Sequence, residues 1–250
     1  MPDRSRIEKG LYWDVAWNPI TGCSPASDGC TNCWAGSQVM SGRTPAVHGS
    51  TDFSQVRFHP ERLNAPLRWK KPRRVFVCNM GDLFHESVPH ENIVSVFSQI
   101  EAAPQHTFMV LTKRPDRMLY HFRGGLSRKF PVLPNLWLGV TVESPEWLWR
   151  LDDLRSIHAA LRFVSFEPLL ADVGKVDFTG IGWAIIGCES GPKARPMAED
   201  WARGIVRQCL DAGVPAFMKQ IHRMTPFGGL RVSKDMDEWP EDLRVREFPK

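Results

Sequence analysis

Residues 22–35 read GCSPASDGCTNCWA and place three cysteines, Cys23, Cys30 and Cys33, in the spacing C-x6-C-x2-C. The stretch follows closely on a short apolar run, Trp13–Trp17, so we expect it to form the loop after a first strand. Its glycines and its proline are typical of a tight loop. Three thiolates are one fewer than a closed four-ligand metal site needs, whereas iron–sulfur clusters are held by cysteine thiolates. The spacing therefore indicates a 4Fe-4S cluster with one iron open to a small molecule.

Two other readings of the cysteines stay open from the spacing alone. Structural zinc takes four Cys or His ligands, and His48 or a distant cysteine could complete such a site, although the chain has no second CxxC pair. Structural or redox thiols are the other alternative. Six cysteines in 250 residues are sparse for a disulfide framework, and a chain of this length does not need one.

Length and composition favour an ordinary α/β protein. A chain of 250 residues, 42% of them hydrophobic, fits one large α/β domain or two small ones. No apolar run approaches the ~20 residues of a membrane span, and the polar N-terminal residues lack a secretory signal, so we expect a cytoplasmic protein that makes no membrane contact. The net charge of +4 is mild. Six basic residues crowd around Trp69, as a phosphate-contacting patch or a solvated face: Arg62, Arg68, Lys70, Lys71, Arg73 and Arg74.

Apolar runs alternate with helix-like stretches along the chain, a pattern typical of a parallel sheet. The expected helices are Glu91–Ala103, Pro145–Ala160 and Glu199–Ala212. Seven strands without a glycine-rich dinucleotide turn favour a full or partial TIM-like (β/α) barrel, with a doubly wound open sheet as the alternative. We assign residues 1–222 to this barrel domain and residues 223–250 to an irregular C-terminal tail. The expected strands are Trp13–Trp17, Arg74–Cys78, Thr107–Thr112, Leu136–Val142, Arg162–Phe166, Trp183–Gly187 and Pro215–Lys219.

Charged residues follow the expected strands at their carboxyl ends, where parallel sheets gather their chemistry. A rim with carboxylates and cations suits a zwitterionic cofactor such as S-adenosyl-L-methionine, whose amine, carboxylate and ribose each need such a partner. Its amine and carboxylate would chelate the open iron, and its reductive cleavage would give a radical that abstracts hydrogen. The rim residues are Asp82, Lys113, Arg114, Glu143, Glu167, Glu189 and Lys219.

Each rim residue receives an expected role from its place along the chain. We assign Asp82 to the methionyl amine and Glu143 to the ribose. Lys113 or Arg114 is expected to bind the carboxylate of the cofactor or of the substrate. The other three are expected to face the substrate as catalytic residues: Glu167, Glu189 and Lys219.

Short runs that follow one another in order carry a family resemblance: Trp17-Asn18-Pro19, Thr21-Gly22-Cys23, Gly29-Cys30-Thr31-Asn32-Cys33-Trp34-Ala35, Met80-Gly81-Asp82-Leu83-Phe84, Leu111-Thr112-Lys113-Arg114-Pro115, Trp137-Leu138-Gly139-Val140, Glu167-Pro168-Leu169-Leu170, Gly187-Cys188-Glu189-Ser190-Gly191 and Lys219-Gln220. On these runs, over residues 13–220, the chain resembles the phage-associated three-cysteine-motif proteins, which are relatives of radical S-adenosylmethionine enzymes. Some members are linked to thymidine hypermodification in bacteriophage DNA.

The resemblance implies a radical-SAM-like barrel and an isomerase. Its reaction would move the attachment of a glycine-modified thymidine from nitrogen to the α-carbon. DNA or a nucleotide is the implied substrate, and a flavodoxin- or ferredoxin-type protein is the implied electron donor. A phage-encoded member would work in the cytoplasm of the host cell.

The chain departs from the family pattern at two places, and two other functions stay open. Trp34 replaces the usual Tyr, and Ile221-His222 replaces the usual Trp-Gly, so the pocket floor or the substrate differs. The first alternative is a zinc-containing nucleic-acid-binding protein without catalysis. The second is a radical-SAM DNA repair lyase on the same barrel, which would act on damaged rather than decorated bases.

Overall fold

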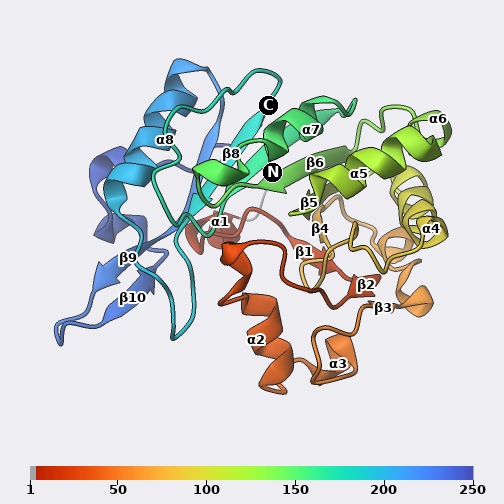
Figure 1. Ribbon diagram of the computed structural model, residues 1–250, viewed down its shortest axis with the longest axis horizontal. Helices are drawn as coiled ribbons and strands as arrows, with labels where there is room; N and C mark the ends of the chain where they lie inside the picture. Colours follow the sequence, from red (N-terminus) through yellow and green to blue (C-terminus); the bar gives the residue numbers. More distant parts are fainter. Residues whose placement is uncertain (1–3, 250) are drawn as a thin grey trace.

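The computed structural model describes residues 4–249 and shows one eight-stranded, mostly parallel sheet with helices packed against it (Figure 1). Neighbouring strands pair in parallel from β1 to β9, and β10 pairs antiparallel with β9. This confirms the expected α/β class with a parallel sheet. In order across the sheet the strands are β1 (Val15–Trp17), β4 (Arg74–Val77), β5 (Thr107–Thr112), β6 (Leu136–Thr141), β7 (Leu161–Phe166), β8 (Trp183–Gly187), β9 (Ala216–Met224) and β10 (Leu230–Ser233).

The sheet has two end strands, β1 and β10, and no pairing within residues 4–249 joins them. A small second sheet pairs β2 (Ile20–Thr21) with β3 (Arg57–Phe58) in antiparallel fashion, at the base of the cysteine loop. The sequence predicts a full or a partial barrel, and these pairings do not close a full one. No helix among the described residues is long and apolar enough to cross a bilayer.

Helices follow the strands as the sequence predicts, although one of them is shorter than expected. The stretch Pro145–Ala160 holds a 3-10 turn, η5 (Pro145–Trp147), and a short helix, α7, before the chain turns into β7. The helices are α1 (Arg4–Glu8), α2 (Trp34–Met40), α3 (Pro45–His48), α4 (His90–Glu101), α5 (Pro115–His121), α6 (Ser127–Lys129), α7 (Arg150–Arg155) and α8 (Glu199–Asp211), with a π-turn, η4 (Phe122–Leu126), between α5 and α6. Further 3-10 turns are η1 (Asp28–Cys30), η2 (Pro60–Arg62), η3 (Pro66–Arg68), η6 (Met236–Glu238) and η7 (Glu241–Leu243).

Side chains on alternate strand positions belong to two separate apolar clusters, because successive side chains of a strand point to opposite faces. Val75 and Val77 pack with the helices, whereas Phe76 between them faces the other side. On that inner face Tyr12 packs edge-on against Trp183, with ring centroids 5.6 Å apart. This aromatic cluster fills the inner face near the amino ends of the strands: Tyr12, Phe76, Met109, Phe163, Trp183, Ile185 and Phe217.

The C-terminal segment, expected to be an irregular tail over 223–250, is instead ordered against the sheet. It contains β10, and Trp239 and Leu243 are buried. The Met218 amide donates to the Val245 carbonyl at 2.9 Å, and this contact covers the edge of β9 that β10 does not reach. An open strand edge needs such a partner, and the sequence of the segment does not reveal it.

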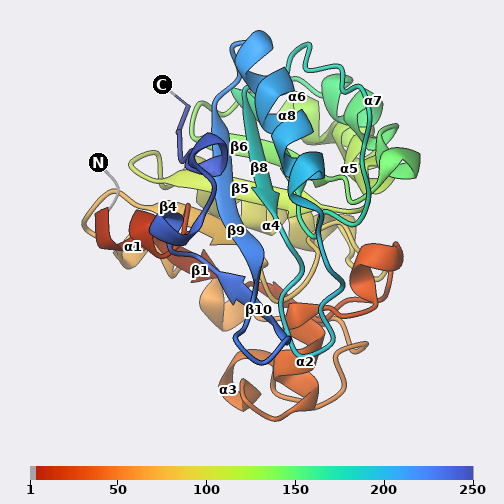
Figure 2. The same cartoon turned by 90° about the vertical axis from the view of Figure 1, so that its left-hand side faces the viewer.

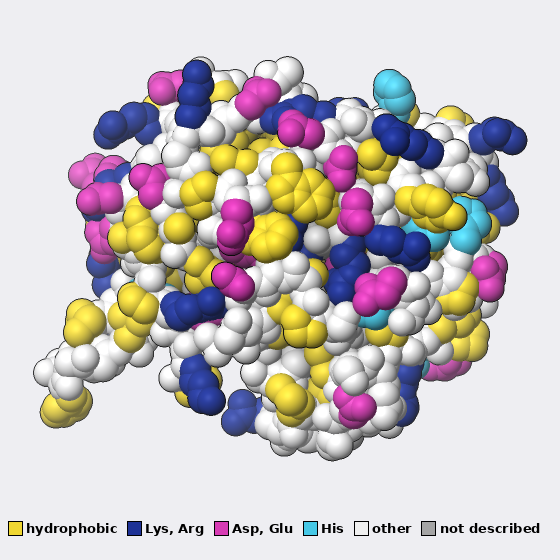
Figure 3. Space-filling view, viewed as in Figure 1, with side chains coloured by type: hydrophobic (Ala, Val, Ile, Leu, Met, Phe, Trp, Pro, Cys, Tyr) yellow, Lys and Arg dark blue, Asp and Glu magenta, His cyan; other side chains and the backbone are white. Residues whose placement is uncertain are grey.

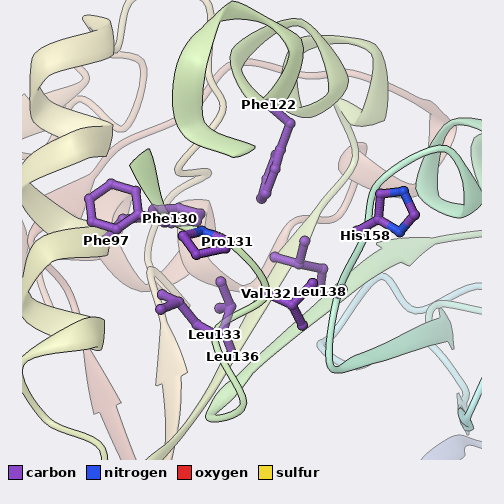
Figure 4. A pocket seen from close by; sticks show the side chains of 10 residues that line it. Phe97, Phe122, Phe130, Pro131, Val132, Leu133, Leu136, Leu138 and His158 are labelled. Atoms are coloured by element: carbon purple, nitrogen blue, oxygen red, sulfur yellow. The ribbon is translucent and has the colours of Figure 1, made fainter. Parts of the chain in front are cut away.

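The hairpin formed by β9 and β10 projects from the body of the protein (Figures 1 and 3). Apolar side chains on it are exposed, Phe227 almost completely at 98%. A small apolar cavity of about 10 Å³ lies elsewhere, between Phe97 of α4, Phe122 and Leu138 of β6 (Figure 4). Since no rim residue lines this cavity, it is a packing void rather than part of the site.

Candidate metal and cofactor site

The three cysteines of the loop surround one cavity. Cys23 follows β2, Cys30 ends the turn η1, and Cys33 is the N-cap of α2. All three are free and half-buried. They line a cavity of about 390 Å³, whose far wall is formed by α2 and residues 51–54.

A different N–H group donates to each of the three sulfurs. The Ala26 amide donates to Cys30 Sγ at 3.4 Å, and the Gly36 amide donates to Cys33 Sγ at 3.5 Å. The Arg114 guanidinium donates to Cys23 Sγ at 3.4 Å. Hydrogen bonds to sulfur are among the features that stabilise and tune thiolate-bound clusters. The donor set therefore fits a group held by three thiolates.

His48 does not supply the fourth ligand that a closed zinc site would need. This side chain is fully buried, and its two ring nitrogens contact the Thr21 hydroxyl at 2.9 Å and the Asp52 carbonyl at 2.8 Å. Within residues 4–249, no three His, Cys, Asp or Glu side chains stand close enough to share a single metal ion.

Glu143 is fully buried beneath the cysteine loop, where it belongs to a cluster of charged side chains. Its Oε1 accepts from the Lys113 ammonium and the Ser27 hydroxyl, and its Oε2 accepts from Arg150 Nη1 at 2.8 Å. The loop fits closely here, because a Cβ added at Gly29 would lie 2.4 Å from Glu143 Oε1. Both oxygens are thus engaged in seating the loop, and the expected contact of Glu143 with a ribose stays a prediction.

Asp82 connects the ends of two strands. Its carboxylate accepts from the Thr112 hydroxyl at 2.7 Å, from the Phe84 amide at 2.9 Å and from the Lys113 amide at 3.2 Å. The side chain is buried. Asp82 thereby anchors the turn after β4 to the end of β5, and its assignment to the methionyl amine stays a prediction.

Arg114 contacts Cys23, the first cysteine of the loop, and the serine that follows it. Its Nη2 donates to the Ser24 carbonyl at 2.9 Å and to the Ser24 hydroxyl at 3.0 Å, and its Nε donates to Glu86 Oε2 at 3.0 Å. Because Nη1 contacts Cys23, the guanidinium faces the loop rather than an open rim. Its assignment to a carboxylate of the cofactor or substrate stays a prediction.

Glu189 is joined to the far side of the cysteine loop, where the segment after β8 runs down beside α2 (Figure 2). Its Oε1 pairs with Arg195 Nη2 at 2.5 Å, and its Oε2 accepts from the Asn32 amide at 3.0 Å. Asn32 also donates to the Lys193 carbonyl at 2.9 Å, and Arg195 donates to the Asp28 carbonyl at 3.0 Å. The structure thus places Glu189 between two loops, and its contact with substrate stays a prediction.

Glu167, which pairs with Lys219, is the most exposed of the three paired glutamates at the rim. Their side chains are 17% and 22% exposed, against 0% for Glu143 and 4% for Glu189. Glu167 and Lys219 continue the inner-face alternation of Phe163 in β7 and Phe217 in β9. They therefore lie nearer the carboxyl ends of these strands than the aromatic cluster does. Burial and then the nearby Glu167 carboxylate raise the pKa of Tyr12, which places this tyrosine close to the pair. The expected contact of Glu167 and Lys219 with substrate stays a prediction.

Most of the basic segment lies away from the site. It precedes β4 and therefore meets the amino end of a strand whose carboxyl end leads to Asp82. Arg62 donates to the Val47 carbonyl at 2.6 Å, and Arg74 pairs with Asp14 at 3.1 Å, so two of its six cations are held internally. Phosphate contacts by the part of the segment from Arg68 to Arg74 would therefore occur at the opposite end of the sheet from the cysteines.

Several site residues were missed from the sequence, although some carry a local signal. Arg150 and Arg195 follow the rim glutamates Glu143 and Glu189 by seven and six positions, a spacing that a turn can close. The others are small polar residues in or beside the cysteine loop: Ser24, Ser27 and Asn32.

A family model described as "Protein of unknown function (DUF5131)" matches residues 4–242. The chain therefore belongs to this family. No curated protein matches the sequence.

Solved structures of spore photoproduct lyase mutants are similar over 92% of this chain and 72% of theirs. A cysteine-to-serine mutant has 10% sequence identity and a TM-score of 0.44. A double mutant with bound AdoMet and dinucleoside spore photoproduct has 12% identity and a TM-score of 0.45.

Proposed function

We propose that this member of the DUF5131 family is a radical S-adenosyl-L-methionine enzyme, whose partial (β/α) barrel holds a 4Fe-4S cluster on Cys23, Cys30 and Cys33. The observation that carries the proposal is the ring of three free thiols around one cavity, each with its own N–H donor. A four-iron cluster binds each thiolate through a different iron, so it suits cysteines spread around a cavity, whereas zinc draws its ligands onto one centre.

The residues of the chain supply positioning around that group. When bound, the reduced cluster and S-adenosyl-L-methionine supply a 5′-deoxyadenosyl radical that abstracts hydrogen from a substrate. Glu143 and Glu189 seat the loop from two sides, and both are nearly excluded from water. A rigid loop in a dry site keeps the reacting groups aligned and protects a radical from solvent. Asp82 remains the proposed partner of the methionyl amine, and Lys113 or Arg114 that of a carboxylate of the cofactor or of the substrate.

The proposed reaction is the isomerisation of a glycine-modified thymidine in phage DNA, from the nitrogen-linked to the α-carbon-linked form. The Glu167–Lys219 pair supports this substrate, since a free glycine carboxylate would match the Lys219 ammonium and a substrate amine would match the Glu167 carboxylate. The inner-face aromatic cluster beneath the pair offers an apolar floor. An electron donor of the flavodoxin or ferredoxin type would reduce the cluster.

Metal analysis after anaerobic reconstitution tests the cluster. We expect about four irons and four sulfides per chain in the natural protein. We expect loss of both in Cys30→Ala and no loss in Cys209→Ala, which removes a buried cysteine outside the loop. Stoichiometric zinc without iron in the natural protein would contradict the proposal and favour the zinc alternative.

Substrate trials test the reaction. The reduced enzyme and its cofactor are incubated with DNA that carries plain, glycine-modified or damaged thymidine, and the nucleosides are analysed by mass spectrometry and chromatography. We expect a product of unchanged mass and new retention from the glycine-modified DNA alone. Conversion of damaged DNA instead would replace the isomerase by a repair lyase on the same cluster.

A further inference from the structure

Arg114 is enclosed beneath the first cysteine, with 8% of its surface exposed. Its guanidinium reaches Cys23 Sγ at 3.4 Å and Asp82 Oδ2 at 3.5 Å through the same nitrogen, Nη1. The other two nitrogens are fixed by Glu86 and Ser24 at 2.9–3.0 Å. A planar guanidinium held at two nitrogens has little freedom at the third, so Nη1 is aimed at the sulfur.

This donor differs in kind from those on the other two sulfurs. The contacts described for Cys30 come from the Ala26 amide and the Ser27 hydroxyl, at 3.4 and 3.9 Å, and that for Cys33 comes from the Gly36 amide. These groups are neutral. Among the described contacts of the three sulfurs there is thus a single charged donor, and it lies on Cys23.

We propose that Arg114 is a positioning residue that sets the reduction potential of the cluster through its charged hydrogen bond to Cys23. The inference rests on the proposed cluster. Hydrogen bonds to the sulfurs and the net charge nearby are principal determinants of the potential of such clusters. Reduction adds negative charge, so a buried cation beside a ligating sulfur stabilises the reduced form and raises the potential.

The surrounding carboxylates only partly offset this charge. Asp82 is buried, but its oxygens also accept from Thr112 and from the Phe84 amide. Glu86 is 59% exposed, so water weakens the effect of its charge without removing it. Of these three charged groups, the guanidinium is the one described in direct contact with Cys23 Sγ.

A redox titration followed by electron paramagnetic resonance, without S-adenosyl-L-methionine, tests this role separately from catalysis. We expect Arg114→Gln to retain the iron content of the natural protein and to shift the midpoint potential to more negative values. Arg114→Lys keeps the positive charge but loses the branched guanidinium, so its midpoint potential should shift less. The matched control is Arg117→Gln, which removes a cation of α5 that contacts the Glu86 carbonyl at 3.4 Å and lies over the Tyr120 ring, with no described contact to a cysteine. Its potential should equal that of the natural protein.

The possible outcomes distinguish a failure of the proposed cluster from a failure of the proposed role of Arg114. A natural protein that takes up no iron would defeat the proposed function itself. A loaded Arg114→Gln protein with unchanged potential would defeat only the role of Arg114. If Arg114→Gln fails to load, Arg114→Lys and Glu86→Gln decide, since the second leaves the cation without its exposed partner and should shift the potential to more positive values. Natural potentials in both would overturn the inference.

Discussion

Arg150 Nη1 lies 2.8 Å from Glu143 Oε2, and the two side chains are 1% and 0% exposed. Arg150 also donates to the Thr141 carbonyl at 2.8 Å and lies over the Trp147 ring. Breaking a buried pair by neutralising one member leaves the other charge uncompensated in a medium of low polarity.

This pair makes Glu143 a stability determinant as well as a rim residue. We expect Glu143→Gln to lower the free energy of unfolding by about 3 kcal/mol, because Arg150 and Lys113 lose their common counter-charge. Urea unfolding of the metal-free protein at pH 7 measures it. The control Glu146→Gln alters an exposed glutamate on the same connection and should cost less than about 0.5 kcal/mol. Equal losses in the two variants would contradict a buried charge cluster.

Gly29→Ala tests how closely the loop fits on that cluster. An added Cβ would lie 2.4 Å from Glu143 Oε1 and 2.6 Å from Lys113 Nζ, so the loop or these side chains must shift. We expect a loss of about 1–3 kcal/mol in stability and a lower iron content after reconstitution. Gly124→Ala, where no atom lies within 4 Å of the added Cβ, serves as the control. Full iron loading of Gly29→Ala would show that the loop tolerates displacement.

His121 predicts a pH dependence of stability. Burial, the Arg117 cation and His90 lower the pKa of His121 to about 4. The unfolded state, with an ordinary pKa near 6.5, therefore binds the proton first as pH falls. Stability is fully present above about pH 6.5 and is lost as pH falls toward 4, by up to about 2 kcal/mol at pH 5. Urea unfolding at pH 7 and pH 5 measures the loss, which should shrink in His121→Gln. An unchanged loss in that variant would assign it to other groups.

If the Glu167–Lys219 ion pair contacts substrate, substitution of Lys219 should impair substrate turnover and leave the cluster intact. We expect Lys219→Met to keep its iron and to lower kcat/KM on the glycine-modified substrate by about 10- to 100-fold, the value of one charged hydrogen bond. Iron analysis and steady-state kinetics measure the two quantities. Lys129→Met, at an exposed lysine of α6, is the control. Equal activity of the two variants would remove Lys219 from the substrate site.

The sequence predicts most of the strands and the placement of polar residues after them, because both are local patterns. The run Thr107–Thr112 is apolar and β-branched, and it forms β5 with the same bounds. The stretch Pro145–Ala160 misleads because Ser144 suggests an N-cap and Glu146 a first helical turn, whereas the chain forms a 3-10 turn there and leaves α7 at Ser156 before β7.

The pairing of the charged residues could not be predicted, since it depends on loops far apart in sequence. Nothing local in Asn32 reveals that it contacts Glu189, 157 positions away. The same holds for the cover of β9 by residues 245–247, which depends on an edge left free by the topology. The sequence therefore predicts which residues gather at the rim, and the structure adds which of them face each other.

The contacts of Arg246 bear on how the protein folds. It donates to the Ile7 carbonyl at 2.6 Å, across 239 positions, and to the Met218 carbonyl of β9 at 3.0 Å. Contacts between such remote segments form late and slowly, because the intervening chain must first be brought together. Until then the flank of β9 is a template for other copies. The yield on dilution from denaturant should therefore rise as protein concentration falls, since self-association competes with this last closure.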